Sequence, residues 1–173
     1  MNMGETTQMI GFVVGESSFA SPIASVHEIV RVPDITPVPD SPAHLIGVMN
    51  LRGRIISVLD LRLGLGLPAS DRTRHSRIIV AEAAGTTVGL LVDSASDVLR
   101  ISTAQVESPA TLFPAGHATY VTGLAKVEDR LVVLVDLALL LEQTIASAGR
   151  SKGAQHTSLT PTSGSMTASP GAR

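Results

Sequence analysis

Three aspartates that directly follow apolar segments are the residues of this chain with the clearest potential for chemistry. Asp60, Asp93 and Asp136 each end such a segment, where a carboxylate can act as a general base or bind a metal ion. An aspartate in this position also caps turns and helices, because its side-chain oxygen accepts a backbone N–H. We interpret all three as caps, since structural residues tend to recur in repeats and Asp60 and Asp136 lie in one.

Other signatures of catalysis or of metal binding are missing from the sequence. There is no cysteine, and therefore no disulfide framework or zinc–thiolate site. There is no G-x-S-x-G motif, and LGLGLP at 63–68 has neither the third glycine of a dinucleotide-binding loop nor the lysine of a P-loop. We predict no catalytic residue, no metal site and no cofactor. The histidines show no i, i+4 pair of the kind that binds zinc on a helix; they are His27, His44, His75, His117 and His156.

The segments that end in Asp60 and Asp136 are two copies of one pattern. GVMNLRGRIISVLDL at 47–61 returns 76 residues later as GLAKVEDRLVVLVDL at 123–137. Ten of the fifteen aligned positions are identical or exchange one aliphatic residue for another. A repeat of this kind indicates one supersecondary unit that is used twice.

A second pair of segments supports the repeat. VHEIVRV at 26–32 matches ASDVLRI at 95–101, in the same order and with nearly the same offset. The small difference in offset is a loop of a length that a protein surface tolerates. We therefore divide the folded part into two related units, at about 9–67 and 78–141.

Short strands must position these residues. Runs of Val, Leu and Ile alternate with glycine- and proline-rich turns, a pattern typical of small β-barrels, and 137–146 is predicted to be a helix capped by Asp136. With 44% hydrophobic but 2% aromatic residues, the core must be aliphatic. Because two barrels of about 60 residues would each be marginal alone, we expect them to share an interface. We predict one mostly-β domain over 1–147 and a disordered Ser/Thr/Gly-rich tail over 148–173.

Charge and hydropathy restrict the partners and the location. The formal net charge of −2 provides no basic surface for nucleic acid. The N-terminal segment carries an acid and lacks the basic region of a signal peptide. The most apolar run, 131–141, is shorter than the roughly 20 residues that a membrane helix needs. We expect a cytoplasmic protein with no nucleic-acid partner and no direct insertion into a membrane.

The two copies differ most at the predicted hairpin turn, which is where a specific function could lie. The first copy has Asn50, Arg52 and Gly53, and the second has Lys126, Glu128 and Asp129 at the same positions. An arginine at a hairpin tip presents a planar fork of donors to a partner, and Glu28 of the same unit could orient it. The alternative is an ordinary solvated arginine, since exposed arginines are common.

Taken together, these segments resemble the CheW family of chemosensory coupling proteins. The resemblance rests on VHEIVRVPDITPVPDSPAHLIGVMNLRGRIISVLDLRLGLGLP, GLLVDSASDVLRI and GLAKVEDRLVVLVDLALLL, and it covers about residues 8–145. It implies a mostly-β fold of two intertwined, five-stranded SH3-like barrels with a short C-terminal helix. It also implies a non-catalytic adaptor between the cytoplasmic tip of methyl-accepting chemoreceptors and the regulatory domain of the histidine kinase CheA. Such adaptors are recruited to membrane-associated receptor arrays.

The same resemblance assigns residues to two contact surfaces. Kinase contact in the family uses the second barrel, where Ala95 and Val98 are the matching positions, although Arg77 departs from the apolar or small residue usual near that face. Receptor coupling in the family uses the groove between the barrels, and the matching positions are Val26, Glu28, Gly47, Asn50, Arg52 and Gly53.

Two alternative functions stay open. One is a small-ligand-binding double barrel, against which the shortage of aromatic residues argues, and the other is a CheW-like module of a non-flagellar chemosensory pathway.

Overall fold

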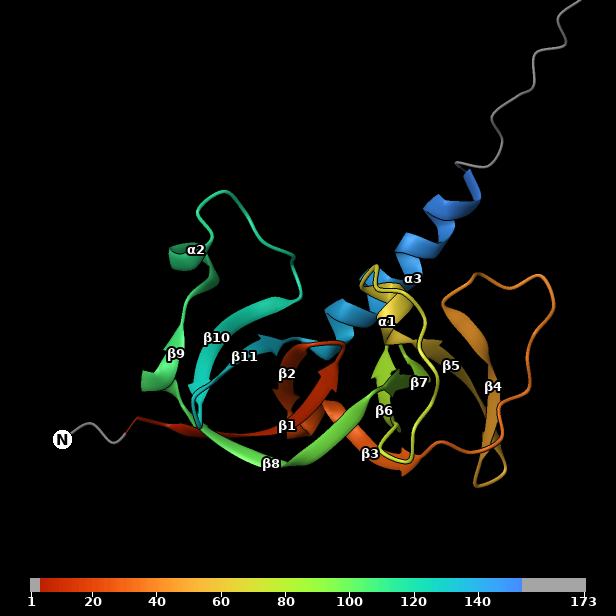
Figure 1. The fold of residues 1–173 in the computed structure, drawn as a ribbon, viewed down its shortest axis with the longest axis horizontal. Helices are drawn as coiled ribbons and strands as arrows, with labels where there is room; N and C mark the ends of the chain where they lie inside the picture. Colours follow the sequence, from red (N-terminus) through yellow and green to blue (C-terminus); the bar gives the residue numbers. More distant parts are fainter. Residues whose placement is uncertain (1–3, 154–173) are drawn as a thin grey trace, which may run out of the picture.

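The protein consists of two strongly curved antiparallel-rich sheets that lie side by side, with one long helix between them (Figure 1). A computed structural model describes residues 4–153. The first barrel has the strand order β3-β6-β7-β5-β4. Its strands are β3 (Val26–Arg31), β4 (Leu45–Leu51), β5 (Arg54–Asp60), β6 (Arg77–Ala83) and β7 (Thr86–Val92).

The second barrel has the strand order β8-β1-β2-β11-β10, in which each strand is the repeat equivalent of the strand at the same place in the first barrel. The two-residue β9 extends its edge. Both barrels contain one parallel pair, β5 with β7 and β11 with β2, among antiparallel neighbours. The prediction of a mostly-β fold with two SH3-like barrels is confirmed. The strands are β1 (Thr6–Val14), β2 (Ser17–Pro22), β8 (Ser94–Ser102), β9 (Val106–Glu107), β10 (Val121–Val127) and β11 (Arg130–Val135).

The two units of the sequence exchange strands. The first unit supplies β3, β4 and β5 to the first barrel but β1 and β2 to the second, and the second unit supplies β6 and β7 to the first barrel. Neither unit therefore forms a barrel from its own strands alone. This exchange explains how two small barrels, each marginal by itself, form one stable body.

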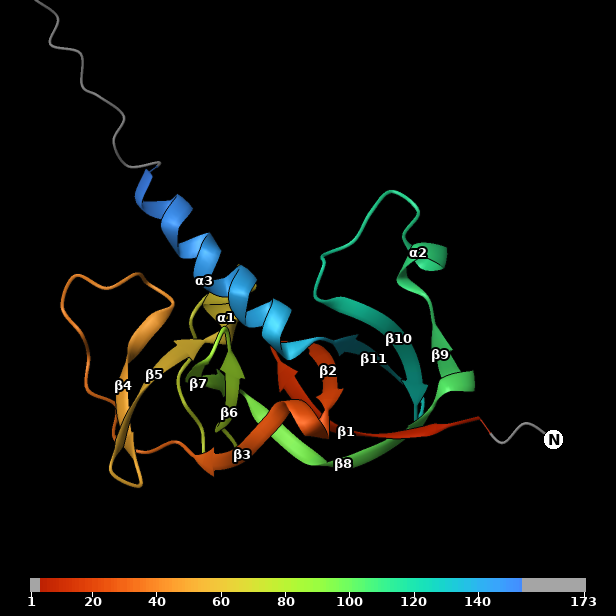
Figure 2. The same ribbon diagram turned by 180° about the vertical axis from the view of Figure 1, so that it is seen from behind.

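The largest hydrophobic cluster lies where the two barrels and the long helix meet. It joins Phe12 of β1, Leu59 of β5 and Leu90 of β7 with Leu137 and Leu141 of α3 (Leu137–Gly153). Smaller clusters fill each barrel. Figure 2 shows α3 beginning between the sheets and passing the short α1 (Leu61–Gly64), so its first turns close the shared core. The other short elements are η1 (Ile23–Ser25), η2 (Thr103–Gln105) and α2 (Pro109–Leu112).

Two of the three aspartates are caps, as predicted. The Asp60 carboxylate accepts the backbone N–H of Arg62 at 2.9 Å at the start of α1, and Asp136 accepts that of Leu139 at 3.1 Å at the start of α3. Burial raises the pKa of Asp60 above its ordinary value, against the opposing effect of the backbone N–H groups of Arg62 and Leu63. The repeated aspartates therefore start the helix that follows each buried strand.

The C-terminal helix is longer than the sequence indicates. α3 continues to Gly153, so it includes the first residues of the segment that we assigned to a disordered tail from 148 onward. Residues 154–173 of that predicted tail lie outside the described residues.

Candidate functional site

A groove runs along the first barrel beside the turn that joins β4 to β5. It has a volume of about 350 Å³ and opens to solvent. Its floor is apolar, because Ile56 and Val80 are almost fully buried, and its rim is charged. We call it the first-barrel groove; its lining is His27, Glu28, Leu51, Arg52, Arg54, Ile56, Val80, Glu82, Gly85 and Thr87.

The sequence prediction that Glu28 could orient Arg52 agrees with the geometry of this groove. Arg52 Nη2 donates to Glu28 Oε2 at 2.9 Å. The Arg52 side chain is 80% exposed while that of Glu28 is 26% exposed. Glu28, on β3, thus holds the guanidinium of Arg52, which otherwise projects into solvent. Only one of its donors is used in this pair, so the others can bind a partner.

The turn that carries Arg52 is tightly built. Both central residues have positive φ, 51° for Arg52 and 82° for Gly53, which is the geometry of the hairpin turns that follow the twist of the strands. The Asn50 side chain accepts the backbone N–H of Gly53 at 2.9 Å. Asn50 and Gly53 therefore shape the tip that presents Arg52, and neither of them lines the groove.

Two other residues assigned to receptor contact, Gly47 and Val26, pack against the rest of the protein. Gly47 is buried with φ 148°, and a side chain there would collide with the backbone carbonyl of Thr36. The Thr36 segment crosses at this point and pairs with Val48 through two backbone hydrogen bonds of 2.9 Å. Val26 is half-buried and packs against the shared core. Of the six predicted residues, the structure brings only Glu28 and Arg52 into this groove, and the groove is lined by the first barrel alone, whereas the family resemblance implies a groove between the barrels.

Sequence reasoning missed several charged or polar residues of the groove. His27 and Glu82 face each other with 3.6 Å between Nε2 and Oε2, and Thr87 and Arg54 complete the rim. Glu82 and Thr87 belong to β6 and β7, which the other sequence unit contributes to this barrel. Among these missed residues, only Arg54 could have been found from the sequence, because it lies two residues after Arg52.

The two residues assigned to kinase contact lie on β8 of the second barrel, at a bulge. Ala95 pairs with Phe12 and Val98 with Ile10, and the register between β1 and β8 shifts between these two pairs. Ala95 is half-buried and packs against the shared core, whereas Val98 is 44% exposed. Of the two, Val98 is the residue whose apolar side chain is exposed to solvent.

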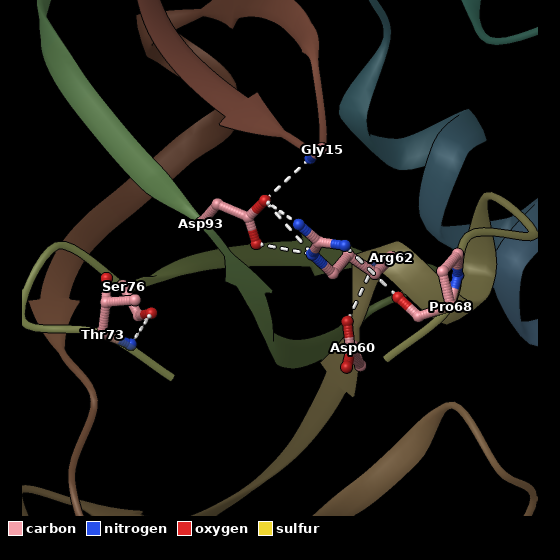
Figure 3. Close-up of polar contacts among 7 residues, drawn as sticks. All are labelled: Gly15, Asp60, Arg62, Pro68, Thr73, Ser76 and Asp93. Atoms are coloured by element: carbon pink, nitrogen blue, oxygen red, sulfur yellow. Dashed lines mark hydrogen bonds and ion pairs between the residues drawn. The ribbon is translucent and has the colours of Figure 1, made fainter. Parts of the chain in front are cut away.

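The interpretation of Asp93 as a cap is wrong, because this carboxylate joins the two barrels instead (Figure 3). Arg62 Nε and Nη2 each donate to the Asp93 carboxylate at 2.8 Å, and the backbone N–H of Gly15 donates to it at 2.7 Å. Arg62 also donates to the Pro68 carbonyl at 3.3 Å. The hydrogen bonds from Arg62 lower the pKa of Asp93 below its ordinary value. This contact ties the β1–β2 turn of the second barrel to α1 beside the first.

Residues 4–153 contain neither a cluster of metal ligands nor a membrane-spanning helix. Within residues 4–153, no three His, Asp or Glu side chains gather closely enough to bind a metal ion. No helix in that range is both long and apolar enough to span a bilayer. The candidate site is the first-barrel groove, with its charged rim and apolar floor.

Comparisons with known proteins agree with this picture. Residues 8–144 match the CheW-like domain family. The chain is 32% identical to a probable chemotaxis protein CheW of Rhizobium etli over 86% of this chain and 95% of that protein. It is 33% identical to the chemotaxis protein CheW of Helicobacter pylori, over 80% and 84%. The crystal structure of the scaffolding protein TtCheW from Thermoanaerobacter tengcongensis matches with a TM-score of 0.70 and 32% identity, over 80% of this chain and 94% of that one.

Proposed function

Since the chain belongs to the CheW-like family, we propose that it is a non-catalytic adaptor that couples methyl-accepting chemoreceptors to the histidine kinase CheA in a chemosensory array. It works in the cytoplasm and is recruited to membrane-associated receptors through protein contacts. The first-barrel groove binds the cytoplasmic tip of the receptor. The exposed face of β8 in the second barrel contacts the regulatory domain of the kinase.

One observation carries the receptor part of this proposal, the Glu28–Arg52 pair at the rim of the groove. Arg52 occupies the hairpin tip that the repeat does not conserve, because Glu128 stands at the equivalent position. A residue needed by both barrels would recur in both copies. An arginine held by a carboxylate and still open to solvent is a good anchor for a partner, and arginine is enriched among the residues that dominate binding energy.

Binding of a purified receptor-tip fragment to Arg52→Glu tests the proposal. We expect the variant to lose about 2 kcal/mol or more of binding free energy, while its thermal unfolding matches wild type because Arg52 is exposed. The control is Arg130→Glu, which reverses the charge of an exposed arginine beside the other hairpin tip. A folded Arg52→Glu protein that binds the receptor fragment as tightly as wild type would show that the groove is not the receptor site.

The pair itself can be tested by exchanging its charges. Glu28→Lys and Arg52→Glu should each weaken receptor binding, and the double variant should recover part of the loss because the two side chains can pair again. Strict additivity of the two losses would show that the residues do not act together.

A separate substitution tests the kinase surface. Val98→Asp should weaken binding to the isolated regulatory domain of CheA and leave receptor binding unchanged, because Val98 lies on β8 and outside the first-barrel groove. Loss of both activities would mean that the variant is misfolded, which thermal unfolding would reveal, or that the two partners share one surface.

A further inference from the structure

Arg54 is the one cation of the first-barrel groove that has no acidic partner among the side chains that the structure describes. Its neighbour Arg52 pairs with Glu28 at 2.9 Å, and His27 lies 3.6 Å from Glu82. No carboxylate of the described chain lies within 4.0 Å of the Arg54 guanidinium. Arg54 is exposed and lines the same groove, so its charge is available to a bound molecule.

The position of Arg54 places its charge beside an apolar floor. Arg54 is the first residue of β5 and pairs in register with Leu51 of β4. Leu51, Ile56 and Val80 line the groove together with it. A protein segment that places an apolar side chain on these residues brings the next side chains to the rim, where a guanidinium binds a carboxylate through two parallel hydrogen bonds.

From this arrangement we propose that Arg54 determines specificity in the first-barrel groove by binding an acidic side chain, Asp or Glu, of the docked receptor tip. The proposal rests on the proposed function, which places the receptor tip in this groove. It assigns different tasks to the two arginines. Arg52 is held from within by Glu28 and anchors the segment, whereas Arg54 selects segments that carry a carboxylate beside the apolar contact.

The second barrel provides a matched control at the equivalent position. Arg130 is also the exposed first residue of a strand, and it lies 76 positions after Arg54. Its surroundings differ, because Glu16 and Asp129 line the same hollow as Arg130, and Glu128 stands where the first tip has Arg52. A charge reversal at Arg130 therefore changes the total charge by the same amount without touching the first-barrel groove.

The experiment measures the Kd of a purified receptor-tip fragment for wild type and for Arg54→Gln, Arg54→Glu and Arg130→Glu at several salt concentrations. We expect Arg54→Gln to weaken binding about three- to fivefold, as for an exposed charge pair. Arg54→Glu should weaken it about tenfold or more, because repulsion replaces the attraction. Arg130→Glu should change it less than about twofold. Binding by Arg54→Gln should also depend less on salt, since one screened interaction is gone.

A charge reversal on the receptor side completes the test. Single Asp→Lys and Glu→Lys variants of the receptor fragment should include one that binds Arg54→Glu better than it binds wild type. Absence of any such variant, or an equal loss for Arg54→Glu and Arg130→Glu, overturns the role of Arg54.

The Arg52→Glu protein separates this inference from the function on which it rests. If Arg52→Glu loses binding while Arg54→Glu binds like wild type, the specificity role is wrong and the receptor groove stands. If both variants bind like wild type, the receptor does not use this groove, and the proposed function and the inference fail together.

Discussion

The two hairpin tips, β4–β5 and β10–β11, have one backbone design and opposite chemistry. Arg52 and Gly53 have φ of 51° and 82°, and Glu128 and Asp129 have φ of 47° and 64°. The second tip therefore adopts the same turn without any glycine. Because the turn geometry is needed to join the strands in both barrels, it persists, while the side chains on it have changed from a cation to two acids. In these residues the backbone atoms set the shape of the turn, and the side chains set the charge that a partner would meet.

The grooves beside the two tips differ in the same way. The second-barrel groove, about 180 Å³, contains Phe12 and Phe19, whose rings stack with 5.5 Å between centroids. The first contains no aromatic residue. Equivalent positions line both grooves, but the first has five ionisable side chains, whereas the second has only Glu128 and Arg130, beside an aromatic wall. The equivalent lining pairs are His27 and Ser96, Leu51 and Val127, Arg52 and Glu128, Arg54 and Arg130, and Ile56 and Val132.

The largest effect that we expect from testing this comparison comes from the repeated glycines. In Gly47→Ala the new methyl group meets the backbone carbonyl of Thr36, and the φ of 148° is unfavourable for alanine. In Gly123→Ala it meets Cγ1 of the Val106 side chain at 2.6 Å, and the nearest backbone atom, the carbonyl oxygen of Glu107, is farther away at 3.3 Å. A side chain can rotate away whereas the backbone cannot. We expect losses in the free energy of unfolding of about 3 kcal/mol for Gly47→Ala and about 1 kcal/mol for Gly123→Ala.

Urea denaturation of the two alanine variants measures both losses. Equal losses would break the comparison, because they would mean that the crossing of the Thr36 segment is as adaptable as the short edge strand β9. A Gly47→Ala protein that folds normally and binds the receptor fragment poorly would instead support a direct role of this glycine in recognition.

A smaller effect should come from the contact between the barrels, which the repeat does not duplicate. Arg62 corresponds to Ala138 in the second unit, so the Arg62–Asp93 pair exists on one side only. Asp93→Asn keeps the shape of the side chain but removes its charge. We expect a drop of several degrees in Tm and faster hydrogen exchange of the Gly15 amide, which donates to Asp93 at 2.7 Å. Asp71→Asn, at an exposed carboxylate, should change neither.

The pH dependence of this loss follows from the lowered pKa of Asp93. A carboxyl group whose pKa is lower in the folded state stabilises the protein above its unfolded pKa, and this stability is lost as the pH falls through the folded pKa. The difference in Tm between wild type and Asp93→Asn should therefore be full above the ordinary pKa of an aspartate and shrink as the pH falls through the lowered pKa of Asp93 in the folded protein. The raised pKa of Asp60 acts in the opposite direction, but its main cause is burial, which both proteins share, and Asp93→Asn removes only the smaller contribution of the Asp93 charge. A difference that stays constant with pH would show that the Asp93 charge does not hold the barrels together.

The contacts that the sequence predicted are those within one unit of the repeat. The strand pairing across Arg52-Gly53 and the caps at Asp60 and Asp136 involve residues a few positions apart, and their pattern occurs twice. Glu28 and Arg52 lie in the same unit, 24 positions apart, and both match positions that the resemblance to the CheW family assigns to receptor contact. Local spacing and duplication were sufficient for these features.

The features that the sequence did not predict are contacts produced by strand exchange. Asp93 meets Gly15, 78 positions away, because β1 and β2 of the first unit join the barrel of the second. Glu82 reaches the groove for the corresponding reason, since β6 lies beside β3. The alternation of residue types along one strand contains no information on which foreign strand will lie next to it. The extension of α3 to Gly153 was missed because small residues such as alanine and serine occur both in helices and in disordered tails.

The smallest expected effects on stability come from substitutions in the two hairpin tips. These substitutions test whether the turn is equally strained in both tips. Gly53→Ala places a methyl group on a residue with φ 82° and should cost about 1 kcal/mol of unfolding free energy. Asp129→Gly should change it by less than about 0.5 kcal/mol, because aspartate tolerates a positive φ of 64° and glycine makes the unfolded chain more flexible. A gain above about 1 kcal/mol for Asp129→Gly, measured by urea denaturation, would show that the second tip is held under strain. In that case the acids at the second tip would have been retained at a cost in stability, and a binding role would have to be sought for them as well.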